Sequence, residues 1–115
     1  MKRSLTQIEK SIIRQIAERL PSNKQHQLLD DLSRSQAEPV TPDEARIIFH
    51  ISGYQRPPYR GQHSFGVEGE LHDKDGTKLT LDLFADENDR LLELELIRWG
   101  DGDLIAPEWS TLKLY

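Results

Sequence analysis

The stretch "VEGELHDKDGTKLTLDLFADENDRLLELELIRW", residues 67–99, alternates apolar and polar side chains over most of its length. In a β-strand, a period of two places every second side chain on the same face, so the apolar residues mark the face turned toward a core. The alternation therefore predicts three antiparallel strands that form a meander from residue 64 onward. The inward residues of these strands are Phe65, Val67, Leu71, Leu79, Leu81, Leu83, Leu92, Leu94 and Leu96.

The first turn of the meander is predicted at "KDG", residues 74–76. The inward residues of both flanking strands are odd-numbered, so opposed positions add up to an even number and the loop must hold an odd number of residues. A three-residue loop with Gly76 in the left-handed conformation meets this requirement. Asp73 is then expected to pair with Thr77.

The second turn falls within "DENDR", residues 86–90, where the inward residues change from odd to even numbers. This change predicts a loop with an even number of residues. One register places Glu93 opposite Asp82, and a shift of two residues places Glu95 there instead. A glycine is expected in such a turn and Asp89 stands in its place, so both registers stay open.

A row of carboxylates crosses three neighbouring strands of the outward face in either register. The first turn places Glu68 opposite Asp82 and Glu70 on the same face, and the second turn adds Glu93 or Glu95. Like charges directly opposed across strands cost about 0.2 to 1 kcal/mol per pair. Either the acids keep a solvated face soluble, or the face is complementary to a basic surface of another protein.

The N-terminal third of the chain predicts two helices. Apolar residues recur at helical spacing on both sides of Pro21, which ends the first helix. Ser4 with Gln7 and Ser22 with Gln25 match the capping-box pattern at the two helix starts. The predicted helical hairpin spans residues 1–35.

The remaining segments are assigned from their proline content and alternation. Residues 35–45, "SQAEPVTPDEA", are predicted to be a linker, and residues 46–51, "RIIFHI", the first main strand. Residues 52–64 combine Gly and two Pro with two Tyr and two Arg, which predicts a loop with binding content. The tail, residues 104–115, either adds a short edge strand or covers one end of the core, and both assignments stay open.

These assignments predict an α+β fold in which two N-terminal helices pack on a mainly antiparallel, four- to five-stranded sheet, largely a meander. A length of 115 residues suits one domain with one core. We expect a single domain over residues 1–115, with the helical hairpin at 1–35 and the antiparallel sheet at 45–115.

Charge is distributed unevenly along the chain. The formal net charge is −5, yet residues 1–26 carry six Lys and Arg against two Glu, which gives +4 there and −9 in the remainder. Nucleic-acid binding depends on cations that contact phosphates, so the acidic sheet disfavours nucleic acid as a direct ligand. A basic protein is the expected partner, and the oligomeric state is left open.

Several classes of chemistry lack the residues that they need. Cysteine is absent, which excludes disulfides and thiolate sites and favours a cytoplasmic location. No segment approaches the run of about 18 apolar residues that a membrane span requires. The "HDKDG" at residues 72–76 places its glycine too early for an EF-hand, and the four histidines lack metal-site spacing. We therefore expect no metal, no cofactor and no membrane association.

The sharpest enzymatic alternative is a small metal-independent ribonuclease, which needs a base, an acid and a cation to hold the phosphate. The candidate residues for these roles are His50, His72, Glu68, Glu70 and Arg98. Arg98 shares the parity of the inward leucines, however, so it is expected to point away from the acids. We expect no enzymatic activity.

Residues 64–108 resemble a family of small bacterial domains with a D-x-D-G hairpin, an L-x-L-x-x-D-E segment and a Leu/Glu-rich strand that ends in Trp. The matching residues are Asp73, Asp75, Gly76, Leu81, Leu83, Asp86, Glu87, Leu92, Glu93, Leu94 and Trp99. Small acidic proteins of this type are similar to immunity proteins of bacterial contact-dependent growth inhibition systems, which bind and block a toxin domain. The resemblance implies a toxin that acts on nucleic acid, whose basic surface an acidic protein would cover.

The resulting hypothesis is an immunity protein that neutralises a cognate, basic nuclease toxin domain by stoichiometric electrostatic complementarity. Trp99 continues the outward parity of the acids, and an exposed Trp beside charged residues is typical of an interface hot spot. A regulatory or structural protein-interaction module is a further alternative. The predicted partner-binding residues are Glu68, Glu70, Asp82, Glu93, Glu95, Trp99, Tyr54, Arg56 and Tyr59.

Overall fold

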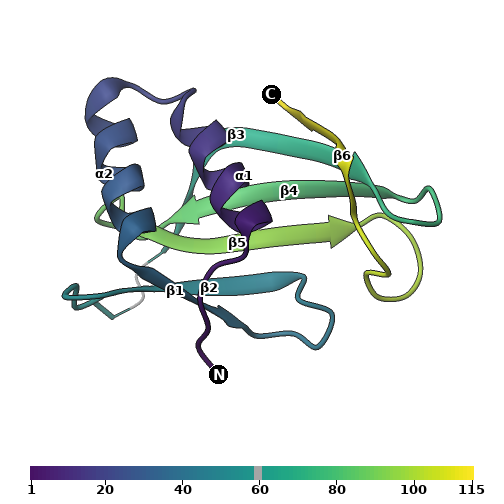
Figure 1. Ribbon diagram of the computed structural model, residues 1–115, viewed down its shortest axis with the longest axis horizontal. Coiled ribbons are helices and arrows are strands. Elements are labelled where there is room, and N and C mark those ends of the chain that lie inside the picture. Colours follow the sequence, from purple (N-terminus) through teal and green to yellow (C-terminus); the bar gives the residue numbers. More distant parts are fainter. Residues whose placement is uncertain (59–60) are drawn as a thin grey trace.

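The computed structural model describes residues 1–58 and 61–115, so Tyr59, one of the predicted anchors, lies outside the described residues. Two helices are followed by an antiparallel, curled sheet, which confirms the α+β class (Figure 1). The elements in chain order are α1 (Gln7–Ala17), α2 (Ser22–Ser33), β1 (Ser35–Pro39), β2 (Arg46–Ile51), β3 (His63–His72), β4 (Lys78–Ala85), β5 (Leu91–Arg98) and β6 (Glu108–Leu114).

The sheet has six strands in the order β1-β2-β5-β4-β3-β6, so the predicted four to five strands were too few. The predicted linker contains β1, which pairs with β2. Its proline, Pro39, is the last residue of an edge strand, where the missing N–H does no harm to the ladder. The tail forms β6, which pairs with β3 and settles the choice in favour of an edge strand.

The helices form over the predicted segments, but their caps differ from the prediction. The capping box of α1 uses Thr6 and Glu9 in place of Ser4 and Gln7: the Glu9 N–H donates to the Thr6 hydroxyl, and the Thr6 N–H donates to the Glu9 carboxylate. The predicted cap at the start of α2 does not form, since Pro21 holds the N-cap position there. The N-cap is the residue at which the helix begins, and that position depends on packing as well as on local sequence.

Both helices lie over the same face of the sheet (Figure 1). Ile12, Ile13 and Ile16 of α1 join the core that includes Leu81 and Leu83 of β4. The opposite face of the sheet, which the helices leave uncovered, is called the outer face below. In the part of the chain that the structure describes, neither helix is long and apolar enough to cross a membrane.

The β3–β4 hairpin confirms the predicted register. The Asp73 N–H donates to the Thr77 carbonyl oxygen at 2.8 Å, and Gly76 has a φ of 86°, in the left-handed region. Glu68 lies opposite Asp82, as predicted. A strictly local turn rule and the period-two pattern were sufficient to place these residues.

Candidate functional site

Three carboxylates lie side by side on neighbouring strands of the outer face. Glu68 of β3 is opposite Asp82 of β4, and Asp82 is opposite Glu95 of β5. Arg46 of β2 comes next, opposite Glu95. Glu68, Asp82 and Glu95 are called the acidic row below.

The pairing of β4 with β5 uses the second of the two registers that the sequence left open, because Glu95 rather than Glu93 faces Asp82. A β-bulge between Phe84 and Ala85 shifts this pairing by one residue. The bulge supplies the change of parity that the sequence argument had assigned to the loop. The acidic row therefore passes through Glu95.

The β4–β5 turn holds three residues, so the predicted even number was wrong. The Asp86 N–H donates to the Arg90 carbonyl oxygen at 2.9 Å, and the Asp89 N–H donates to the Asp86 carbonyl oxygen at 2.9 Å. Asp89 has a φ of 62°, in the left-handed region where a glycine was expected. A short polar side chain tolerates this conformation better than most residues do.

Glu93 was predicted to lie on the exposed row, and this prediction was wrong. Its surface is only 2% exposed. Arg46 Nη2 donates to Glu93 Oε1 at 2.8 Å, and Arg46 Nε donates to Oε2 at 3.3 Å. A buried carboxylate needs such a partner, so Glu93 stabilises the β2–β5 junction and leaves the acidic row to Glu95.

A hollow of about 290 Å³ opens on the outer face around the acidic row. Trp99 and Ile97 form its exposed apolar wall, with 63% and 43% of their surfaces accessible. The Trp99 indole N–H donates to the Thr80 hydroxyl at 3.0 Å, which fixes the ring beside the carboxylates. The residues that line this Trp99 hollow are Glu68, Thr80, Leu81, Asp82, Phe84, Glu95, Ile97 and Trp99.

The described residues supply no cation that pairs with the acidic row. Among residues 1–58 and 61–115, no ion pair involves Glu68, Asp82 or Glu95. Burial raises the pKa of Asp82, and the Glu68 carboxylate raises it further. The Ser64 hydroxyl donates to Asp82 Oδ1 at 2.6 Å and offsets only part of this rise in pKa. Ionisation of Asp82 therefore costs more free energy than ionisation of an ordinary aspartate.

Glu95 experiences the same two effects. Burial raises the pKa of Glu95, and the carboxylates of Glu93 and Asp82 add to the rise, whereas Arg46 lowers it. The Arg46 side chain gives both of its hydrogen bonds to Glu93, so it lowers the pKa of Glu95 only by charge attraction without a direct contact. Asp82 and Glu95 are therefore both partly desolvated, and neighbouring carboxylates further disfavour the charged form of each.

Glu70 lies on the outer face as predicted, but at its border. It is opposite Thr80 of β4 and opposite Lys113 of β6. Lys78 Nζ lies 3.6 Å from Glu70 Oε1. Its charge is therefore partly neutralised, in contrast to that of the acidic row.

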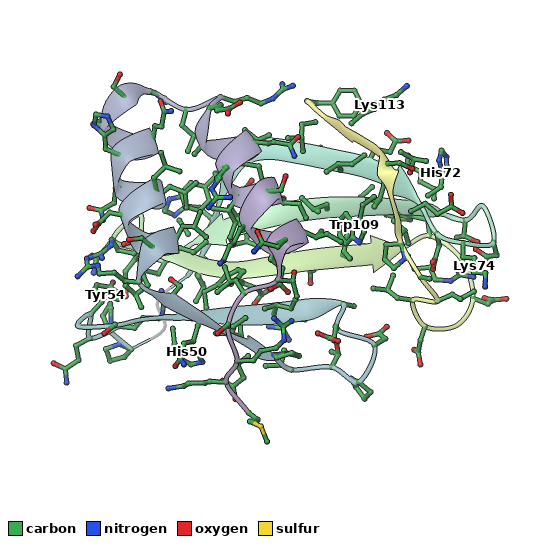
Figure 2. All side chains as sticks on the ribbon, viewed as in Figure 1. His50, Tyr54, His72, Lys74, Trp109 and Lys113 are labelled. Atoms are coloured by element: carbon green, nitrogen blue, oxygen red, sulfur yellow. The ribbon has the colours of Figure 1, made fainter. Side chains whose placement is uncertain are left out.

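Tyr54 and Arg56, the predicted loop anchors, bind within the protein. The Tyr54 hydroxyl donates to Asp86 Oδ2 at 2.6 Å, and Arg56 Nη1 donates to the same oxygen at 2.7 Å. The guanidinium of Arg90 lies 4.3 Å from the centre of the Tyr54 ring, a cation–π contact. Figure 2 shows Tyr54 at the opposite end of the sheet from the β3–β4 hairpin, where Trp99 pairs with Lys78. Tyr54 and Arg56 therefore hold the loop and the β4–β5 turn.

Of the residues of the ribonuclease alternative, Glu68, Glu70 and His72 share one face of β3, but Arg98 and His50 are held elsewhere. Arg98 Nη1 donates to Asp73 Oδ2 at 2.9 Å, so the phosphate-binding candidate is bound to the β3–β4 hairpin. His50 is hydrogen-bonded to Glu38 at 2.6 Å, and His72 lies at the far end of the sheet from it (Figure 2). Within the described residues, no group of three or more His, Cys, Asp or Glu is placed to hold a metal ion.

Sequence reasoning missed the neighbours that shape the site: Arg46, Ser64 and Thr80. Arg46 had a usable signal, because it occupies an outward position on a strand adjoining an acidic sheet. Its partner Glu93 is 47 residues away in the chain, however, and no local pattern links the two. Ser64 and Thr80 are brought to the site by the way β3 pairs with β4.

Comparisons with curated proteins and with solved structures gave no match. A comparison with protein families matched residues 2–107 to the family described as "Domain of unknown function (DUF6984)". The match covers both helices and five of the six strands, including the whole acidic row. The chain therefore belongs to the DUF6984 family.

Proposed function

We propose that the protein is a stoichiometric inhibitor, an immunity protein that binds and neutralises a basic toxin domain, with a nuclease as the favoured target. The observation that carries the proposal is the acidic row, three like charges in register without an ion-pair partner among the described residues. Folding alone disfavours such a row. A cationic surface that docks on it would remove the repulsion.

The apolar wall of the Trp99 hollow supports a protein partner. Trp99 and Ile97 are large, exposed side chains that lie directly beside the acidic row. Protein interfaces commonly combine an aromatic anchor with charged residues around it. A nuclease active site must be basic to hold phosphates, so an acidic cover would occupy the surface that the substrate uses.

In this proposal the protein acts in the cytoplasm of the cell that makes it and catalyses no reaction. Charge attraction speeds the encounter, and the acidic row fixes the orientation of the partner. Glu68, Asp82, Glu95 and Trp99 form the central contact, with Glu70 at its border. Glu93, Tyr54 and Arg56 support the fold behind it.

The test uses the protein encoded beside this one, or its C-terminal domain, as the toxin. Calorimetry should give tight one-to-one binding that weakens with added salt, and co-expression should rescue growth. The double variant Glu68→Lys with Glu95→Lys should lose at least about 100-fold in affinity, since close interfacial charge pairs couple strongly. Glu87→Lys with Glu108→Lys makes the same change in net charge at two exposed positions outside the hollow.

The matched control separates a docking surface from a general effect of charge. Equal loss of affinity in both double variants would show that only net charge matters. Unchanged affinity in Glu68→Lys with Glu95→Lys would remove the outer face from the proposal. Absence of both binding and rescue would return the acidic row to the role of a solvated surface.

A further inference from the structure

The Trp99 hollow has two chemically different walls, and together they fit one kind of side chain. On one side, the carboxylates of Asp82 and Glu95 come from directly opposed positions of β4 and β5. On the other side, the Trp99 ring is 63% exposed and is fixed by its hydrogen bond to Thr80. Acidic and aromatic groups thus face one space of about 290 Å³.

The spacing of the carboxylates suits a planar, forked cation. Opposed residues on antiparallel strands have Cβ atoms about 5 Å apart, so two carboxylates can each accept an N–H from one guanidinium. A guanidinium also stacks on an indole face and gives up its hydration more readily than an ammonium does. Lysine offers a single point charge and would satisfy one carboxylate better than two.

The protein's own cations leave this position open. Arg46 lies opposite Glu95 on the neighbouring strand, but its guanidinium is hydrogen-bonded to Glu93. Lys78 is near Glu70, at the border of the outer face. Among the described residues, neither these cations nor any other forms an ion pair with Asp82 or Glu95.

We propose that the Trp99 hollow binds an arginine side chain of the partner, with the guanidinium between Asp82 and Glu95 and stacked on Trp99. The inference rests on the proposed function and names the chemistry of its central contact. On this inference, the protein selects its partner by one arginine side chain rather than by the partner's overall positive charge. Glu68, at the end of the acidic row, attracts the guanidinium by its charge but is not one of the two carboxylates that bind it.

The test uses the full chain labelled with ¹⁵N and two short peptides, acetyl-Gly-Arg-Gly-amide and acetyl-Gly-Lys-Gly-amide. The indole N–H resonance of Trp99 should shift and saturate with the arginine peptide. The lysine peptide should bind about three- to tenfold more weakly, since it lacks the fork and the stacking. Trp109, which packs against the core from β6 and is labelled in Figure 2, is an internal control whose indole resonance should not move.

Two variants locate the binding. Glu95→Gln keeps the shape of the hollow but removes one of the two carboxylates that would bind the guanidinium. It should weaken binding of the arginine peptide about tenfold. Glu108→Gln, an exposed acid on β6, should leave it unchanged. Equal binding of the two peptides, or a Trp99 shift that survives Glu95→Gln, would overturn the arginine assignment.

Failure of this inference can be told apart from failure of the proposed function. Tight, salt-sensitive binding of the toxin together with no selectivity for the arginine peptide would keep the inhibitor and reject the arginine contact. A further test replaces each arginine of the toxin by lysine, one at a time, and measures the affinity of the complex. One of these substitutions should cause a large loss of affinity. A complex that tolerates every such substitution would reject the arginine contact as well.

Discussion

Asp82 and Glu95 are directly opposed on adjacent strands, two carboxylates of the same charge with a third, Glu68, on the next strand. Burial raises the pKa values of both Asp82 and Glu95; the Glu68 carboxylate adds to the rise at Asp82, and the carboxylates of Glu93 and Asp82 add to it at Glu95. The sheet therefore carries an electrostatic cost at its centre. That cost can be measured in the free protein, without any partner.

Replacing Glu95 by Gln should stabilise the free protein by up to about 1 kcal/mol at pH 7, because the substitution removes one of two opposed charges. A carboxyl whose folded pKa is raised destabilises the native state above that pKa, and the effect vanishes below the unfolded pKa of about 4. The gain should therefore disappear as the pH falls toward 3.5. Urea unfolding at the two pH values measures it, and an equal gain at both would exclude the electrostatic cause.

Replacing Tyr54 by Phe should lower the free energy of unfolding by about 1 to 2 kcal/mol. The substitution keeps the ring that Arg90 contacts but removes the hydroxyl donor to Asp86. Affinity for the toxin should not change, since Tyr54 lies away from the Trp99 hollow. Urea unfolding measures the stability of this variant, and calorimetry measures its affinity for the toxin. Weaker toxin binding with unaltered stability would restore Tyr54 as an interface anchor.

Replacing Asp73 by Ala should cost about 3 kcal/mol of stability, because it strips a buried carboxylate from several donors at once. Asp73 is 1% exposed and accepts from the backbone N–H groups of Ile105 and Ala106 as well as from Arg98. Asp75→Ala removes the more exposed carboxylate that binds the same arginine and should cost much less stability than Asp73→Ala. Similar losses in the two variants, measured by urea unfolding, would contradict this account.

Carboxyl titrations followed by ¹³C NMR should divide the aspartates into two groups. Burial acts to raise the pKa of Asp73, but the N–H groups of Ile105, Ala106 and Lys74 and the Arg98 guanidinium outweigh it, so the pKa lies below its ordinary value. The stability that Asp73 contributes is therefore present above the ordinary Asp pKa of about 3.9 and is lost as the pH falls through the folded value. Asp82 should titrate above about 3.9, and a reversed order would reject the assigned environments.

The sequence predicted the parts of the fold that depend on short-range rules. The β3–β4 hairpin follows from a period-two pattern and one glycine, so its register and the Glu68–Asp82 pair were correctly placed. Trp99 was also placed correctly on the outer face from parity alone. These rules act within a few residues and need no knowledge of the distant chain.

The errors arose where a distant contact or a local irregularity took over. A bulge that leaves Leu92 of β5 unpaired, opposite Phe84 and Ala85, altered the count of residues in the β4–β5 pair, and bulges have no reliable signature in the sequence. Glu93 was assigned to the exposed row because its burial depends on Arg46 of another hairpin. The internal contacts of the aromatic and basic loop were missed for the same reason, since the contact of Tyr54 with Asp86 spans 32 residues.

The strand order has a consequence for how the chain is made. β5 lies between β2 and β4, although it is the last of the three to leave the ribosome. Until residues 91–98 are available, the β1–β2 hairpin and the β3–β4 hairpin each present an open edge and cannot join into one sheet. Such non-local closure slows folding and exposes unpaired edges to aggregation. The sheet is therefore completed only after β5 has been made, and a nascent chain interrupted before residue 91 leaves the two hairpins without the strand that joins them.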